Sequence, residues 1–228
     1  MKQKQSGFTL IEIAIVLVII GLLLGGVLKG QELINSAKVK NLATDFKNIP
    51  VYIYGYQDKF RSLPGDDGSA ASHVDGASVA STGGTINNGV IEGEWDTSTP
   101  TDETMRFWQQ IRMAGLATGP TGAAADILPT NSVNGVIGIT NSGTDNPDPN
   151  APNGIKGSYI ICSASILGKY ANQLDIQMDN GDPLTGSMRT YTQAGGRGTA
   201  LGIPTAPASL EANGNLIDAN SYTVCMGV

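Results

Sequence analysis

The chain has 228 residues, enough for one well-buried core and too few for more than one or two domains. Its formal net charge is −6 and its lysines and arginines are scattered, so we expect no nucleic-acid partner. Charged residues make up only 15 % of the sequence, and 30 glycines indicate many turns and loops.

The first element is an apolar segment of 21 residues from Phe8 to Leu28, in which Glu12 is the one charged side chain. At about 1.5 Å of rise per residue, such a helix nearly spans the roughly 30 Å hydrocarbon core of a bilayer. A cleaved secretory signal also starts with basic residues such as Lys2 and Lys4, but it has a shorter apolar stretch and an Ala-x-Ala-like site, which does not follow Leu28. An ordinary membrane anchor fits the length but does not explain Glu12.

Residues 7–12, GFTLIE, resemble the type IV prepilin processing motif, in which a basic leader ends in glycine and the mature chain begins with a methylated phenylalanine. The resemblance implies that a prepilin peptidase cuts after Gly7 and N-methylates Phe8. It also implies an inner-membrane assembly platform and other pilin subunits as partners. The expected fold is α+β and type IV pilin-like, with a long N-terminal α-helix packed against an antiparallel β-sheet head domain.

Cutting after Gly7 creates an α-ammonium on Phe8, which gives the Glu12 carboxylate an opposite charge in the apolar layer. A spacing of four residues places the two groups on one helix face, and the terminus of a neighbouring subunit could pair with Glu12 instead. A buried carboxylate without a partner costs free energy or takes up a proton, so a filament favours the register that pairs it. We expect Glu12 to act in assembly; the alternative is a carboxylate that snorkels to the headgroups.

Three glycines, Gly21, Gly25 and Gly26, interrupt the apolar run. The spacing of Gly21 and Gly25 allows close approach of helices in membranes, and all three lower helix propensity. In pilins this region can lose helicity on assembly. Many major pilins carry a proline further along, where this chain has Leu-Lys-Gly at 28–30. The resemblance therefore implies a packing or melting role for these glycines and favours a minor pilin or pilin-like subunit.

An amphipathic pattern follows, so the helix is expected to continue to Arg61, with a kink or a short interruption at Pro50. The tyrosines near its end are interpreted as a packing stripe under the head: Tyr52, Tyr54 and Tyr56. We expect four parts: a leader at 1–7, a transmembrane and filament-core helix at 8–28, the amphipathic half at 29–61, and a head domain outside the cytoplasm at 62–228.

Small and polar residues dominate 66–98, which we interpret as a long surface loop region with Trp95 as the candidate for an exposed contact. A second helix is predicted after Pro100 and before Gly115. Trp108 lies on its buried stripe and is interpreted as core rather than as a carbohydrate platform. Strands are predicted at Val133–Thr140, Gly157–Cys162 and Ser221–Met226.

Cys162 and Cys225 have no second Cys or His nearby to complete a metal site, so a single disulfide and an oxidising compartment are predicted. The disulfide would link the central strand to the last strand and stabilise the region 162–225 by roughly 4 kcal/mol on the chain-entropy model. In pilins such a region often carries surface variation and contacts.

A short helix is predicted at Lys169–Met178, followed by a turn rich in oxygen ligands. Its members are Asp179, Asn180, Gly181, Asp182 and Pro183. The turn resembles the C-terminal loops of some pseudopilins that hold calcium, and we consider calcium the one cofactor candidate. The spacing does not match an EF-hand loop, so an Asx-rich turn is the preferred interpretation.

No nucleophile elbow or phosphate-binding loop is present, and the lone His73 is interpreted as an exposed loop histidine, so no enzyme is predicted. The leading hypothesis is a structural subunit of a type IV pilus or related filament, held in the bacterial inner membrane and later in a surface pilus or periplasmic pseudopilus. One alternative is a type II secretion pseudopilin. The next hypothesis is a membrane-anchored surface binding protein that does not polymerise. The last hypothesis is an exported hydrolase.

Overall fold

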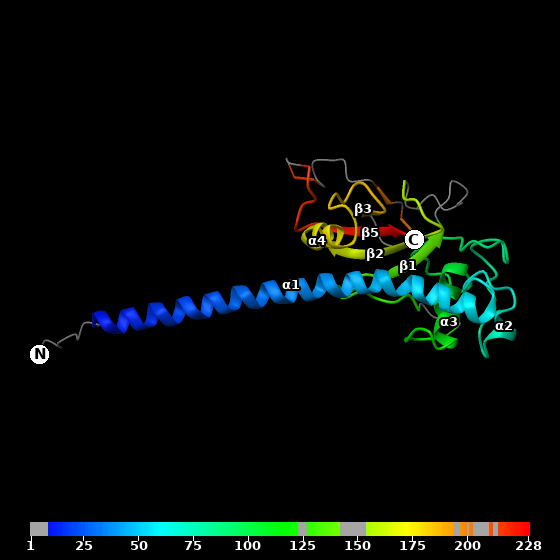
Figure 1. The fold of residues 1–228 in the computed structure, drawn as a ribbon, viewed down its shortest axis with the longest axis horizontal. Coiled ribbons are helices and arrows are strands. Elements are labelled where there is room, and N and C mark those ends of the chain that lie inside the picture. The colour runs from blue at the N-terminus through cyan, green and yellow to red at the C-terminus, as the bar shows by residue number, and fades with distance from the viewer. Residues whose placement is uncertain are drawn as a thin grey trace, which may run out of the picture. The chain divides into compact units, whose positions relative to one another are not determined.

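The computed structural model describes residues 9–122, 127–141, 154–193, 197–199, 201–202, 210–211 and 214–228. The chain divides into two compact units, Met1–Lys38 and Val39–Val228. The elements are, in order, α1 (Leu10–Phe60), α2 (Ala70–His73), α3 (Glu103–Met113), β1 (Ile137–Asn141), β2 (Tyr159–Leu167), α4 (Gly168–Met178), β3 (Met188–Gln193), β4 (Leu201–Gly202) and β5 (Ser221–Gly227). This is an α+β arrangement, as predicted, with one antiparallel sheet (Figure 1).

α1 is a single helix of 51 residues that continues through Pro50. Of the two predicted outcomes at Pro50, the short interruption is therefore absent, and the kink stays a prediction. A proline inside a helix removes one backbone hydrogen bond and costs about 3 kcal/mol. Here Ile49 and Ile53, on either side of Pro50, are 2 % and 1 % exposed, so packing in the head core holds the helix together across the proline.

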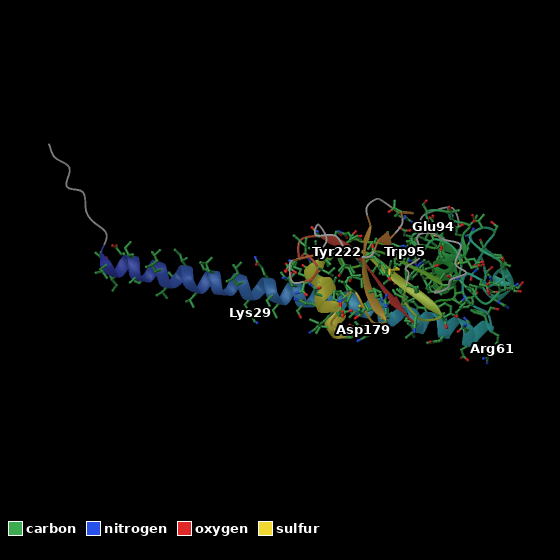
Figure 2. All side chains as sticks on the ribbon, turned by 90° about the horizontal axis from the view of Figure 1, so that it is seen from above. Lys29, Arg61, Glu94, Trp95, Asp179 and Tyr222 are labelled. Carbon is green, nitrogen blue, oxygen red and sulfur yellow. A yellow bond between two sulfur atoms is a disulfide. The ribbon has the colours of Figure 1, made fainter. Side chains whose placement is uncertain are left out.

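In the first unit, the side chains of α1 before Lys29 stand out from the ribbon on all sides (Figure 2). The apolar side chains from Leu10 to Leu28 are exposed, and an 18-residue window of α1 has a mean hydropathy of 2.8. Among the described residues, α1 is the one helix that is long and apolar enough to cross a membrane. Such a surface is stable only in an apolar environment, because burying it removes it from water.

The sheet in the second unit has the strand order β1-β2-β5-β3-β4, and each neighbouring pair is antiparallel. The three predicted strands are present with different ends. β1 begins four residues later than predicted, because Asn131 Oδ1 accepts the backbone N–H groups of Val133 and Gly135 and fixes a turn there. β2 runs beyond Cys162 to Leu167. β3 and β4 were not predicted, since polar residues and glycines surround them in the sequence.

Side chains along β2 alternate between the two faces of the sheet, as the period of a strand requires. Ile161 belongs to the larger core, which also contains the buried side of α1. Ile160 and Cys162 belong to a smaller core on the opposite face, together with Trp95 and Tyr191. The side chains of α1 buried in the larger core are Val39, Leu42, Ala43, Phe46, Ile49, Ile53 and Tyr56.

α3 is buried on every side, and its polar side chains bind the backbone of the loops around it. Gln110 Oε1 accepts the N–H of Gly65 at 2.7 Å, and Gln110 Nε2 donates to the carbonyl of Ser78 at 3.0 Å. The predicted apolar stripe with Trp108 is confirmed, since Trp108 is 3 % exposed. The polar side chains of α3 satisfy backbone groups of the loops, as strand pairing would do in a sheet. Parts of 66–98 are buried, among them Ile91 and Trp95, so the prediction of a surface loop region is wrong for those residues.

Candidate processing and assembly site

The predicted processing residues Gly7 and Phe8 lie outside the described residues, which begin at Thr9. Glu12 is described, and its carboxylate turns back to the start of α1. Glu12 Oε2 accepts the backbone N–H and the hydroxyl of Thr9, each at 2.8 Å. In return, the Glu12 N–H donates to Thr9 Oγ1 at 3.3 Å. The two residues thus form a capping box at the N-terminus of the helix.

This capping box was missed in the sequence, although the Thr-x-x-Glu spacing that marks it is present at residues 9–12. It shows that Glu12 has hydrogen-bond donors within the uncut chain. Both donors belong to Thr9 and are uncharged, so they do not neutralise the negative charge of Glu12. A role for Glu12 in assembly, through an ammonium group, stays a prediction.

Gly21, Gly25 and Gly26 all lie inside α1, where the helix is unbroken. A Cβ atom added at any of them would meet no other atom within 4 Å. Within the part of the chain that the structure describes, the glycines therefore have no packing role. They leave a smooth strip on an apolar helix, which is the surface that a second helix can approach most closely. Their proposed roles in packing or melting remain predictions.

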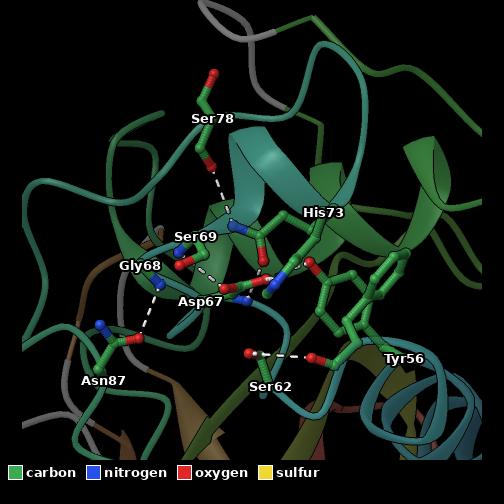
Figure 3. Close-up of polar contacts among 11 residues, drawn as sticks. Tyr56, Ser62, Asp67, Gly68, Ser69, His73, Ser78 and Asn87 are labelled. Carbon is green, nitrogen blue, oxygen red and sulfur yellow. Dashed lines mark hydrogen bonds and ion pairs between the residues drawn. The ribbon is translucent and has the colours of Figure 1, made fainter.

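Where α1 ends, two side chains and one backbone N–H group contact the buried carboxylate of Asp67 (Figure 3). Tyr56 donates its hydroxyl to Asp67 Oδ2 at 2.8 Å, and His73 Nδ1 lies 2.7 Å from the same oxygen. The backbone N–H of Ser69 donates to Asp67 Oδ1 at 2.9 Å. Burial, and then the hydrogen bond and charge of Asp67, raise the pKa of Tyr56. The cluster fastens the end of α1 to the following turn and to α2.

His73 is therefore not the exposed loop histidine that was predicted. Its side chain is 29 % exposed, and its ring stacks on Phe60 with a centroid distance of 5.5 Å. An Asp–His pair of this kind also occurs in catalytic sites, where the histidine acts on a nucleophile. Here Asp67 Oδ2 also accepts the hydroxyl of Tyr56. The contacts of Asp67 and His73 therefore connect the end of α1 to α2.

Trp95 is completely buried, so its predicted role as an exposed contact is wrong. It packs in the smaller core, against the face of the sheet that carries the disulfide. The backbone at Trp95 approaches β1 so closely that a Cβ at Gly138 would collide with the Trp95 carbonyl group. Thr140 Oγ1 holds the same segment by donating to the carbonyl of Gly93 at 2.8 Å. The acidic residues near Trp95 in the sequence obscured this packing.

The predicted disulfide between Cys162 and Cys225 is confirmed. The two residues lie directly opposite each other in β2 and β5, and both are completely buried. The bridge therefore joins the central strands of the sheet and fixes the last strand of the chain.

The residues that follow α4 form a tight polar turn. Asn180 Oδ1 accepts the N–H of Asp182 at 2.9 Å, and Asp182 Oδ1 accepts the N–H of Leu184 at 3.1 Å, so both side chains make Asx turns. Asp179 Oδ2 accepts the N–H of Met188 at 2.8 Å. Over the described part of the chain, no group of three His, Cys, Asp or Glu residues is placed to hold a metal ion. Calcium binding at this turn stays a prediction.

Asp175, an acidic residue of α4 near this turn, is buried. Asp175 is 1 % exposed, and the backbone N–H of Gly181 offsets only part of the cost of burying its carboxylate. Burial, followed by the charge of Asp179, raises the pKa of Asp175 to about 6. A buried carboxylate of this kind is costly when charged, so Asp175 favours a proton at mildly acidic pH.

The comparisons with known proteins bear on the N-terminal segment alone. Residues 2–28 match the family model of the prokaryotic N-terminal methylation motif. No curated protein and no solved structure matches the chain. The matched residues include both predicted processing positions, Glu12 and the glycines of the apolar run, and they extend into the exposed apolar part of α1.

Proposed function

We propose that this type IV pilin-like protein is a structural subunit of a type IV pilus or a related filament. The match of residues 2–28 to the methylation motif carries the proposal, and the motif together with the long apolar helix fits a type IV pilin-like protein. The motif implies processing by a prepilin peptidase and assembly with other pilins. In the proposed order of events, the peptidase cuts after Gly7 and methylates Phe8, and the assembly platform then extracts the chain from the membrane.

The exposed apolar surface of α1 supports both stages of this life cycle. Each square ångström of apolar surface removed from water contributes roughly 25 cal/mol. Lipid chains and the apolar helices of other copies remove this surface from water about equally well. Transfer of α1 from the bilayer to the filament therefore costs little hydrophobic free energy. Close packing at the glycines and pairing of the Glu12 charge can then favour the filament. We propose that the chain is first held in the inner membrane with the head outside the cytoplasm.

A pseudopilus of a type II secretion system is the alternative filament, because the processing motif is common to both. A membrane-anchored surface protein that never polymerises would share the apolar helix, but it would not need the methylated N-terminus. The state of the N-terminus and the presence of the chain in appendages therefore distinguish these hypotheses.

Mass spectrometry of the protein purified from its membrane tests the processing step. We expect a mature chain that begins with N-methylated Phe8. An intact Met1, or a cut beyond Leu28, would contradict the pilin-like function. Labelling of this chain in purified surface appendages then separates an abundant subunit, a minor component at few positions, and an anchored monomer that is absent from the appendages.

A further inference from the structure

A cavity of about 270 Å³ lies within the second unit, between α1, α3 and the segment that leads into β1. α1 lines it with Asp45, Ile49 and Tyr52, which share one helix face at spacings of four and three residues. α3 contributes Trp108 and Arg112, again one turn apart. Three elements from distant parts of the sequence thus form a built cleft with apolar and charged walls.

Arg112 brings a cation into this cavity without a counter-ion. Arg112 is 7 % exposed as a residue, and its Nη1 donates to the backbone carbonyls of Pro120 and Ile127. Neither Arg112 nor Asp45 takes part in an ion pair among the described residues. Carbonyl groups satisfy hydrogen bonds but do not neutralise a charge, and a buried charge without a partner is destabilising.

Asp45 is the opposite charge on the other side of the cavity. Its carboxylate is partly buried in the wall formed by α1 and has no hydrogen-bond partner among the described residues. Burial alone raises the pKa of Asp45 to about 6. A guanidinium in contact would lower this pKa, so Arg112 and Asp45 share the cavity without neutralising each other.

We propose that this cavity binds a free α-amino acid with an apolar side chain, with the ligand's ammonium group on Asp45 and its carboxylate on Arg112. A zwitterion is the ligand class that supplies both missing charges at once. The apolar side chains of Ile49, Trp108 and Ile137 line the same cavity and would contact the ligand's side chain. The cavity is smaller than a typical pocket for a drug-sized ligand, which fits a molecule of amino-acid size.

Isothermal titration calorimetry on the full-length protein in detergent tests this proposal with L-leucine and L-phenylalanine. Two half-probes accompany L-leucine: isopentylamine lacks the carboxylate, and 4-methylpentanoate lacks the ammonium group. We expect at least one amino acid to bind, and L-leucine to bind at least about tenfold more tightly than either half-probe. No binding by either amino acid, or half-probes that bind as tightly as L-leucine, would overturn the proposal.

A matched pair of variants assigns the charge on α1. Asp45→Asn should weaken amino-acid binding at least about tenfold while leaving the binding of 4-methylpentanoate unchanged or stronger. Asp58→Asn, at a position 86 % exposed on the same helix, should change neither. Unchanged amino-acid binding by Asp45→Asn would show that the cavity does not recognise an ammonium group. The half-probe comparison uses only the wild-type protein, so it decides the matter even when a variant folds poorly.

Discussion

Tyr56 donates a 2.8 Å hydrogen bond to the buried carboxylate of Asp67. The tyrosine is in the last turns of α1, and the aspartate is in the turn that follows the helix. Since His73 contacts the same carboxylate oxygen, this one acidic group connects the helix, the turn and α2. Polar contacts around Asp67 therefore connect segments of the second unit in addition to its apolar core.

Tyr56→Phe tests this fastening. The ring stays in the core, but Asp67 loses a donor, which should lower the free energy of unfolding by about 1–2 kcal/mol and Tm by a few degrees. Thermal unfolding followed by circular dichroism measures the change. Tyr54→Phe is the matched control, because Tyr54 is 62 % exposed and makes no such bond. Equal Tm values for the two variants would show that the hydrogen bond does not stabilise the head.

Glu103→Gln should stabilise the protein at neutral and alkaline pH. Burial raises the pKa of Glu103 to about 7 from its ordinary 4.5, against the lowering effect of the hydrogen bond from the Glu92 N–H. The negative charges of Asp66, Glu92 and Asp102 add smaller upward effects. The folded state therefore keeps a proton that the unfolded chain has released. The free energy of unfolding falls as the pH rises from about 4.5 to about 7 and is constant above that window, a loss of up to about 3 kcal/mol.

Tm measured between pH 4.5 and pH 8 checks this prediction, since the window is set by the pKa of Glu103. The variant should exceed the wild type in Tm at pH 8 and approach it at the acidic end. Asp45 and Asp175, with pKa values raised to about 6, leave a smaller pH dependence of the same sign. Glu32→Gln is the control, because the side chain of Glu32 is 70 % exposed in the first unit. Its Tm should change with pH as that of the wild type does. Parallel curves for wild type and Glu103→Gln would refute the assignment.

The double variant Cys162→Ser, Cys225→Ser should lose about 2–5 kcal/mol of unfolding free energy. The bridge closes a chain segment with a sequence separation of 63, so the unfolded chain gains freedom when it is removed. Denaturant unfolding measures the loss. Thiol labelling of the unfolded wild-type protein under non-reducing conditions should find no free cysteine, and labelling of both residues would contradict the disulfide.

Glu12→Ala should leave membrane insertion and processing largely intact and block polymerisation, because the filament loses the charge that pairs with an N-terminal ammonium group. Thr9→Ala separates this effect from capping. It removes the side-chain cap of α1, worth about 1 kcal/mol, but keeps the carboxylate, so filaments should still form. Electron microscopy of sheared appendages and mass spectrometry of the N-terminus report the two outcomes. Unchanged filaments in Glu12→Ala would refute the role in assembly.

Calcium binding at the turn after α4 can be tested by chelation. The Asx-turn interpretation predicts that EDTA leaves the Tm of the head unchanged, because Asn180 and Asp182 already satisfy backbone N–H groups. A calcium site predicts a lower Tm after chelation and no such effect in Asp182→Asn. Differential scanning calorimetry with and without calcium distinguishes the two.

The long helix, α3, the three strands β1, β2 and β5, and the disulfide could be predicted because each depends on a local pattern. Apolar periodicity defines α1 and α3, and two isolated cysteines define the bridge. β3 could not be predicted because its residues, MRTYTQ, alternate weakly and owe their strand geometry to pairing with β5. The helix is not interrupted at Pro50, because the packing of Ile49 and Ile53 outweighs the local cost of a proline.

The side-chain clusters were harder to predict than the elements. Asp67 and His73 lie in the region 66–98 that is predicted as a surface loop, since nothing in the sequence shows that Tyr56 reaches them. Trp95 was placed at the surface because its neighbours are acidic, yet the close approach at Gly138 buries it. Only the capping box of Thr9 and Glu12 had a sequence signature that was available and unused. Contacts between residues far apart in the sequence depend on the whole fold, so local sequence propensities do not predict them.

We expect the two faces of the sheet to respond differently to mechanical force, because one shares its core with α1 and the other carries the disulfide. A pull along α1 reaches the sheet through apolar side chains such as Phe46 and Ile53, which would have to slide past the strands together. On the other face, the bridge between β2 and β5 prevents the last strand from peeling away. We therefore expect tension on the helix to be carried by the core that it shares with the sheet, while the covalent bond keeps β2 and β5 together.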